Sequence, residues 1–593
     1  TRAADRERET PAETRAREAT DAFLRHTLTR IGDAQGANPA PASAVFASHP
    51  LVVAAAARVV GAYAPWLGQT AGRGDGVAVA RACAAYLVAA LGAAPEAFRH
   101  ASGAFHALCA QCADAFARNR DTVGGLLDAA ERALPESPPA GDGAGPAGGG
   151  AFGGGGVDGD DDRAGVVEGL ARVVAAVADP REAAVYAKRL TAPIMARAAR
   201  HAARAKATGE IPSALAAELK LLASALRFLE FPGFDAAARR AAASGNASTS
   251  EIEHPALAAL SEAWPTLAEF NAEPWRSVPA VADATSAVYQ KALLCAKARG
   301  AAVAPHVLEA LAATFAAHHH PSCLDAFATA AEACFSNTAN ENRAEFEKLH
   351  ALFCPAFASC VEAAAACLSA HPIADKADVA RALFECAHKI ATFAPFVFLN
   401  ATHAGNARHT TSGLACHTAL SIAVAALSTR ERDAVRAATA LLSIAAAPGD
   451  VASRSETWRA GRKRSVDAFF SSASGESAVK ACLLAGADHA PRHVLRPLAQ
   501  FLCALRNTYG SAVDAWLANT LADASFPDAA APAPPAAREA FRAAATRSAP
   551  GADGSLTGHG APLDARRWAA ACVDFFMVCR RELGEDALVA HQM

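Results

Sequence analysis

The sequence predicts an all-α protein, an α-solenoid of antiparallel helix pairs. Alternating β-branched runs are nearly absent, and apolar residues recur three or four positions apart, which is the spacing of one helix face. Helix, short turn and helix follow one another along most of the 593 residues. Hydrophobic residues make up 52% of the chain, much of it alanine, the best helix former, and aromatic residues only 6%. We therefore expect a core of alanine, leucine and valine with scattered phenylalanine.

One stretch shows the repeating unit. Apolar positions mark three successive helices at residues 281–295, 303–315 and 324–334. The second of these ends in three histidines, His318 to His320, whose imidazoles would meet the carbonyl end of the helix, and Ser322 would cap the next helix. About a dozen pairs of roughly 40–47 residues fit the chain, which is the length of HEAT-like repeats in an armadillo-type superhelix.

Composition divides the chain into five segments. HEAT-like repeats are expected at 1–134 and 164–522, and a C-terminal helix within 561–593. Residues 135–163 combine glycine, proline and aspartate and lack apolar side chains to bury, so a disordered insertion is expected. Residues 523–560 are rich in proline and alanine around one short helix at 536–546, and a flexible segment is expected there.

Apolar periodicity predicts the remaining helices in order along the chain, with a loop at 237–250. Two of them open at His-Pro dipeptides, His49-Pro50 and His254-Pro255. The predicted helices cover residues 1–30, 49–66, 79–91, 101–116, 166–178, 183–204, 212–228, 256–270, 343–368, 377–391, 414–427, 430–445, 458–472, 478–484, 491–508, 512–521 and 563–583.

Bulk properties exclude several classes of function. The net charge of −3 gives no argument for nucleic-acid binding. No unbroken apolar run reaches the ~20 residues of a membrane span, so no membrane interaction is expected. The N-terminus carries charges of both signs and is no signal peptide, so the fifteen cysteines are expected to be buried free thiols in a reducing compartment. Because the chain begins with Thr1 rather than Met, we expect that an N-terminal portion is missing.

Two groups of metal-ligating residues favour structural interpretations. Cys109 and Cys112 have zinc-pair spacing, but no second such pair completes a four-ligand site, so core cysteines are expected. His318, His319 and His320 point in different directions at a helix end and cannot converge on one metal. No nucleotide fingerprint, EF-hand spacing or nucleophile elbow is present. We expect no metal, no cofactor and no enzymatic activity; the alternative, a metalloenzyme that uses these side chains, would require stoichiometric zinc.

Two basic clusters are the candidate binding residues. One is dense and lies beside Trp458, and the other is thinner and lies at the end of the helix predicted at 281–295. A solvated helix end and a docking point for phosphate or an acidic partner are both consistent with such charge runs. The residues are Arg459, Arg462, Lys463 and Arg464 in the dense cluster, and Lys291, Lys297 and Arg299 in the thinner one.

Several stretches of the sequence, taken together, match the pattern of a known protein family. They include His318-His-His-Pro-Ser-Cys323, Ala370-His-Pro-Ile-Ala-Asp375, Leu502-Cys-Ala-Leu-Arg-Asn-Thr-Tyr509 and the terminal Cys579-Arg-Arg581. Their order and spacing, from about His49 to the C-terminus, resemble repeats of the transportin-SR class of nuclear import receptors in the importin-β superfamily.

The resemblance implies a fragment of a karyopherin-type nuclear import receptor that shuttles between nucleus and cytoplasm. Protein cargo would bind on the inner face of the HEAT solenoid. In this class the preferred cargo is serine/arginine-rich (SR) splicing factors, recognised through phosphorylated RS domains. GTP-bound Ran, a small GTPase, triggers release and binds mainly N-terminal repeats that precede this chain. Neither a membrane nor direct nucleic-acid binding is implied.

One helix departs from the family's pattern. Where RS-binding members carry a stripe of arginines, residues 281–298 contain Lys291 and Lys297 as the basic residues, and lysine lacks the bidentate fork that grips phosphate. Cargo contacts are expected from these lysines and Arg299, or from the cluster at 459–464. The alternative function is a HEAT-repeat protein-interaction scaffold without a transport role, whose partner would stay bound when GTP-bound Ran is added to the full-length protein.

Overall fold

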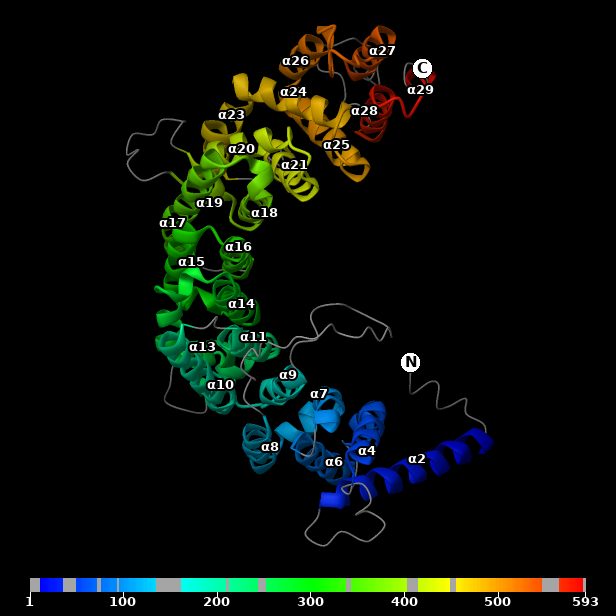
Figure 1. Cartoon of the computed structure of the whole chain (residues 1–593), viewed down its shortest axis with the longest axis vertical. Helices are drawn as coiled ribbons and strands as arrows, with labels where there is room; N and C mark the ends of the chain where they lie inside the picture. Colours follow the sequence, from blue (N-terminus) through cyan, green and yellow to red (C-terminus); the bar gives the residue numbers. More distant parts are fainter. Residues whose placement is uncertain are drawn as a thin grey trace. The chain divides into compact units, whose positions relative to one another are not determined.

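The structure is a computed structural model of the chain. It describes residues 11–35, 49–71, 76–92, 95–134, 162–209, 213–243, 252–336, 343–402, 414–447, 455–546 and 565–589. Within these ranges the chain is predominantly helical, and the β-structure is an isolated bridge between Thr402 and Leu414. The chain forms two compact units, Thr1–Arg299 (unit 1) and Gly300–Met593 (unit 2) (Figure 1).

In unit 1 the main helices form two stacks that pack on one another. Stack A contains α2 (Pro11–Gly32), α6 (Gly76–Leu91), α8 (Arg120–Ala133), α10 (Pro180–Thr208) and α13 (Pro255–Phe270). Stack B contains α4 (Pro50–Ala62), α7 (Pro95–Ala117), α9 (Asp162–Ala175), α11 (Ser213–Arg227) and α14 (Pro279–Ala296). Shorter elements are η1 (Asp33–Gln35), α5 (Ala64–Thr70), α12 (Phe234–Ala243), η3 (Trp275–Ser277) and η4 (Lys297–Ala302).

Unit 2 repeats the arrangement with two further stacks. One contains α15 (Ala304–His318), α17 (Arg343–Ala370), α20 (Ala415–Ala426), α24 (Ala473–Ala487) and α26 (Ser511–Ala522). The other contains α16 (Pro321–Phe335), α18 (Ala377–Phe393), α21 (Arg432–Ala446), α25 (Arg492–Tyr509) and α28 (Ala565–Cys579). Shorter elements are η6 (Ile373–Lys376), α19 (Pro395–Asn400), α22 (Glu456–Arg462), η9 (Lys463–Asp467), α23 (Ala468–Phe470), α27 (Pro535–Thr546) and α29 (Asp586–Val589). The all-α class and the helix pairs predicted from the sequence are confirmed.

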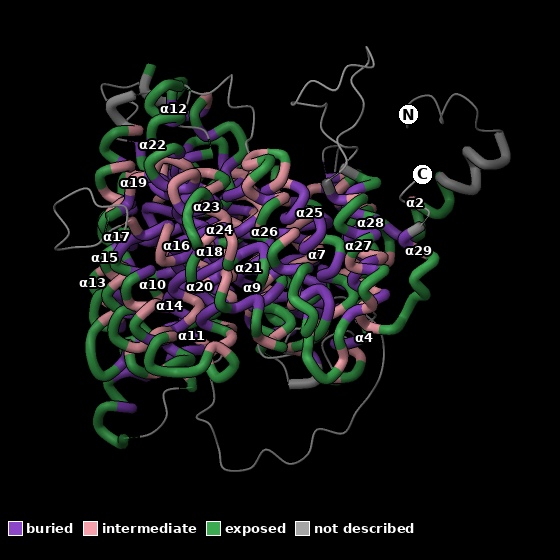
Figure 2. Tube along the Cα trace, turned by 90° about the horizontal axis from the view of Figure 1, so that it is seen from above, coloured by how far each residue is buried: buried purple, intermediate pink, exposed green. Residues whose placement is uncertain are grey.

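Small residues let neighbouring helices approach closely. The buried core is mainly alanine, leucine, valine and phenylalanine, and it lies where helices face one another (Figure 2). On α9, a Cβ added at Gly165 would lie 2.5 Å from the hydroxyl of Ser102 on α7, and one at Gly169 would lie 3.2 Å from the Cβ of Cys109. The pair of glycines one turn apart therefore sets the distance between α7 and α9.

Histidines mark several helix ends, as the sequence predicts. The Nδ1 atoms of His49 and His254 accept hydrogen bonds from the backbone N–H groups of Leu51 and Ala256, both at 3.2 Å, and so cap α4 and α13. Helix α15 ends at His318, and His319 takes the left-handed conformation with φ of 57°. The capping role expected for Ser322 is wrong, because Pro321 already occupies the first turn of α16 and Ser322 lies inside that helix.

Several predicted boundaries are corrected. The helix expected at 49–66 is two helices, α4 and α5, with a bend of 53° before Pro65, whose ring and missing N–H oppose a continuous helix. Residues 234–243 form α12 inside the loop expected at 237–250, because Phe234 is buried. The helix expected at 458–472 is broken by the π-helical turn η9. Helix α2 is described from Pro11, so the first ten residues of the predicted 1–30 helix lie outside the described part.

The predicted insertion at 135–163 lies outside the described residues except at its end. Asp162 and Arg163 belong to α9, and Arg163 is buried. Its Nη1 is 2.5 Å from Oε1 of Glu218 on α11, whose other oxygen is 3.0 Å from Nε of Arg197 on α10. These three side chains join three helices through a buried charged network, which explains why the helix begins before the expected boundary.

The described part of 523–560 is packed rather than flexible. Phe526 is buried and stacks on Phe575 of α28 at 6.2 Å, and Phe541 of α27 stacks on the same ring at 4.4 Å. Burial of these aromatic rings holds residues 523–546 against α28. The C-terminal helix expected at 563–583 is present as α28, followed by the short α29.

One helix is long and apolar enough on average to span a membrane, although it contains no unbroken apolar run of about 20 residues. Residues 346–370 of α17 form a 25-residue segment with a mean hydropathy of 1.8, which meets the length and composition of a span. Two further helix pairs, each bent, meet the same test when each pair is taken as one span. In the structure, α17 packs on α15 and α20, and Phe353, Phe357 and Val361 on it are fully buried.

Candidate functional site

The thinner basic cluster lies at the C-terminal end of α14 in unit 1, and two of its members are paired within the chain. Nζ of Lys297 is 2.9 Å from Oε1 of Glu230. Arg299 donates from Nε and Nη2 to Oδ1 of Asp235, at 3.1 and 2.8 Å. The carboxylates follow α11, so Lys297 and Arg299 fasten the end of α14 to that segment.

The Arg299 pair rests on a buried aromatic and a buried histidine. The guanidinium of Arg299 lies 5.2 Å from the centroid of Phe234, and the Phe234 ring is 4.9 Å from that of His254. Burial lowers the pKa of His254 to about 4, and the charge of Arg299 adds to the effect. At neutral pH His254 is therefore uncharged and its Nδ1 can accept the α13 capping hydrogen bond. Arg299, with Phe234 and His254 beneath it, therefore stabilises the fold at the end of α14.

Lys291 has a different environment. It is half-buried on α14, and among the described residues no carboxylate lies within ion-pair distance of it. Burial lowers the pKa of Lys291, and the positive charge of Arg227 lowers it further. Lys291 is therefore grouped with another cation rather than with an anion.

A phenylalanine beside this pair carries two guanidinium groups. Phe228 follows α11 directly, and its ring centroid is 4.2 Å from Cζ of Arg172 on α9 and 5.3 Å from Cζ of Arg227. The ring of His106 on α7 approaches Phe228 edge-on at 6.2 Å. Four successive helices of stack B thus each contribute one basic side chain. We call His106, Arg172, Arg227, Phe228 and Lys291 the Phe228 cluster.

The Phe228 cluster holds positive charge that the described residues do not neutralise. His106 is 3.6 Å from Glu168, and burial lowers the pKa of His106, an effect that Glu168 opposes and Arg172 reinforces. For Arg172 and Arg227, no carboxylate of the described chain lies within ion-pair distance, and the Nε of Arg172 is buried without a hydrogen-bond partner. A guanidinium stacked on an aromatic face keeps its N–H edge available. The cluster is therefore suited to hold an anion.

Sequence reasoning identified Lys291 and missed the other four members of the Phe228 cluster. The basic members of the cluster, at positions 106, 172, 227 and 291, are far apart in the sequence and match no local motif. The signal that could have found them is that each lies on the next helix of the same stack.

The dense basic cluster lies on α22 and η9 in unit 2, and its members differ. Arg462 is buried, with Nη1 and Nη2 donating to the carbonyl oxygens of Ala447 and Ala446 at 3.0 and 3.3 Å and Nε at 3.2 Å from Asp467. It therefore caps the C-terminal end of α21. Of the remaining members, Arg464 donates to Asn400 at 3.3 Å, and Arg459 and Lys463 are exposed.

The cysteine and histidine candidates are placed as the structural interpretation predicted. Cys109 and Cys112 are buried in α7, and burial raises the pKa of Cys112 to about 12. His318, His319 and His320 form the junction between α15 and α16. Within the ranges that the structure describes, no group of three or more histidine, cysteine or acidic side chains is arranged to hold a metal.

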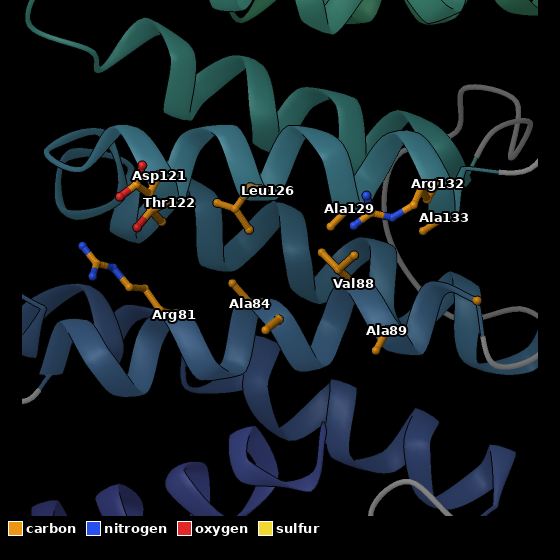
Figure 3. Close-up of a pocket in the computed structure, with 13 residues that line it drawn as sticks. Arg81, Ala84, Val88, Ala89, Asp121, Thr122, Leu126, Ala129, Arg132 and Ala133 are labelled. Carbon is orange, nitrogen blue, oxygen red and sulfur yellow. The ribbon is translucent and has the colours of Figure 1, made fainter. Parts of the chain in front are cut away.

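A groove lies between α6 and α8 in stack A of unit 1 (Figure 3). Its volume is about 650 Å³, and small side chains such as Ala84, Gly125 and Ala129 line its floor and walls. Arg81 and Arg132 lie toward opposite ends of it (Figure 3). The groove has room for an apolar side chain, and its polar lining near Arg81 is Asp121 and Thr122.

Comparison with known proteins rests on structure. No protein-family model and no curated protein matches the sequence. Among solved structures, the chain is similar to importin-13 in its cytosolic state, with a TM-score of 0.61 and 14% identity over 90% of this chain and 50% of importin-13. The chain thus spans about half the length of that protein. The likeness shows the fold and does not single out the transportin-SR class. Over these residues the chain has the karyopherin-like HEAT-repeat fold.

Proposed function

We propose that the chain is part of a karyopherin-type nuclear import receptor that carries protein cargo and shuttles between nucleus and cytoplasm. The observation that carries the proposal is the likeness to importin-13 across 90% of the chain. A stack of helix pairs presents a long continuous surface suited to extended or disordered partners, which agrees with a cargo receptor. The whole receptor would release its cargo on GTP-bound Ran, and no catalytic role is proposed.

The finer part of the proposal is the cargo, which we take to be SR splicing factors. Support comes from the Phe228 cluster, which includes Lys291 and whose arginines and lysine have no carboxylate of the described chain within ion-pair distance. Binding to an acidic partner through such a surface is steered by charge and weakened by salt. The paired state of Lys297 and Arg299 makes these two weaker candidates than Lys291.

The test is binding of this chain to an intact SR splicing factor, phosphorylated and dephosphorylated, at two salt concentrations. We expect binding that requires phosphorylation and weakens with salt. Equal binding of the two forms, or none to either from a folded sample, would remove SR splicing factors as the cargo. Release by GTP-bound Ran is measured separately on the full-length receptor, and cargo that stays bound there would contradict the transport role.

A further inference from the structure

We infer that the Phe228 cluster is a binding site for a phosphorylated serine or threonine of a partner protein. The inference rests on the proposed cargo-binding function and deepens it by naming a site and its ligand chemistry. Its members come from α7, α9, α11 and α14, so the fold rather than any single helix creates it.

The geometry presents prearranged donors. Cζ of the Arg172 guanidinium lies over the Phe228 ring, 4.2 Å from its centroid, and its Nε is buried without a partner. Arg227 shares the same ring at 5.3 Å. Contact with the ring restricts the positions of both guanidinium groups, which reduces the ordering cost of binding an anion.

The charge favours a phosphate monoester over a carboxylate. Arg172, Arg227 and Lys291 have no carboxylate of the described chain within ion-pair distance, and the pKa of Lys291 is lowered by burial and by Arg227. A phosphorylated side chain brings close to two negative charges and three strong acceptor oxygens, whereas a carboxylate brings one charge and two oxygens. The phosphate therefore matches three cations better.

The surroundings favour a protein over a nucleic acid. Two carboxylates lie near the cluster: Glu168 is 3.6 Å from His106, and Glu230, two residues after Phe228, is paired with Lys297 at 2.9 Å. A continuous phosphate backbone would pass these carboxylates and be repelled, whereas an isolated phosphate on a peptide need not approach them. Basic side chains of the same peptide would find partners there.

The test measures fluorescence anisotropy of a phosphoserine peptide, its unphosphorylated form and a single-stranded oligonucleotide with the full chain. Arg172→Lys keeps the charge and removes the fork, and Phe228→Leu keeps apolar volume and removes the aromatic face. We expect each variant to weaken phosphopeptide binding about tenfold and to leave the unphosphorylated peptide unchanged. Lys297→Ala is the matched control, since that cation is already paired, and should change binding less than about twofold.

Three outcomes overturn the site. Phosphopeptide binding that survives both Arg172→Lys and Phe228→Leu would place the phosphate elsewhere and leave the proposed cargo function standing. Stronger binding of the oligonucleotide than of the phosphopeptide would mean that the partner is a nucleic acid and not a phosphorylated protein. Equal binding of the phosphorylated and unphosphorylated peptides to the native chain would show that the site does not bind phosphate. The transport role would then be decided by the Ran release experiment. Circular dichroism melts confirm that the variants are folded.

Discussion

The dense basic cluster in unit 2 and the Phe228 cluster in unit 1 show how differently basic residues are used in this chain. The first is evident in the sequence, with four basic residues between positions 459 and 464. The structure turns Arg462 inward to bind the end of α21 and leaves Arg459 and Lys463 in solvent. The second is assembled from four helices, and its guanidinium groups converge on one ring.

The difference teaches that charge density along a chain is a poor guide to charge density on a surface. Successive helical residues point about 100° apart, so Arg462 and Arg464, two positions apart, lie on different sides and the four basic residues do not all face one ligand. Stacked helices bring together residues at equivalent levels, so one cation per helix suffices to build a patch. The same contrast separates Lys291 from Lys297, six positions later, which is neutralised by Glu230.

The largest effect is expected at Arg462. Arg462→Ala removes hydrogen bonds to two carbonyl groups at the end of α21 and the ion pair with Asp467. Because these groups are mostly buried, we expect a loss of about 3 kcal/mol in the free energy of unfolding, measured by urea denaturation. Arg464→Ala, two residues away, is the control and should cost less than about 0.5 kcal/mol. Equal effects would mean that the cluster acts as one surface.

A pH dependence is expected from His254, which lies beneath the Arg299 pair. Its pKa of about 4 in the folded chain lies below the unfolded value of 6.5, so its stabilisation is complete above pH 6.5 and is lost as the pH falls toward 4. Between pH 7 and pH 5 the loss is about 2 kcal/mol. Hydrogen exchange of α13 amides at the two pH values measures it.

The control for that measurement is His254→Asn, which keeps a capping side chain and removes the titration. The variant should lose protection of α13 by a smaller factor between pH 7 and pH 5 than the native chain. If the native chain and His254→Asn lose protection equally, a group other than His254 titrates. The interpretation that the Arg299 end of α14 stabilises the fold would then lose its main support.

A smaller effect is expected at Arg299. Arg299→Ala removes two hydrogen bonds to Asp235 and the contact with Phe234. Because the pair is partly exposed, we expect a loss of about 1 kcal/mol in thermal or urea unfolding. Phosphopeptide affinity should stay within about twofold of native. A strong loss of phosphopeptide binding with no change in stability would reverse the roles assigned to Arg299 and Lys291.

The smallest effect is expected at Lys297. Both members of the Lys297–Glu230 pair are more than half exposed, at 60% and 56%. Exposed pairs of this kind contribute little, so Lys297→Ala should cost about 0.5 kcal/mol or less in unfolding free energy. Lys291→Ala, by contrast, should leave stability nearly unchanged and weaken phosphopeptide binding. If the two alanine variants behave alike in the binding assay, the pairing of Lys297 does not decide its role.

Most of the fold could be predicted from the sequence because it depends on local signals. The 3.6-residue apolar period and the His-Pro capping dipeptides at 49 and 254 placed most of the main helices, but not α8. What could not be predicted depends on contacts between distant segments. Phe526 is held by Phe575, and Phe234 anchors an unexpected helix, neither of which is visible in local periodicity.

The candidate site was predicted only at Lys291. Arg172 and Arg227 were indistinguishable from ordinary surface arginines until the stack aligned them over Phe228. Conversely, Arg462 met every criterion of an exposed basic run, and only the end of α21 explains its burial.

The stacks also bear on how the chain reaches its fold. The main helix contacts within each unit join elements close in sequence, such as α7 with α9 and α16 with α18, rather than a unit's first helix with its last. Such topologies have low contact order and form without long loop closures. Each new helix pair can therefore pack on the one before it as the polypeptide emerges from the ribosome. Folding of a unit's first helices does not require its last helices to have been synthesised.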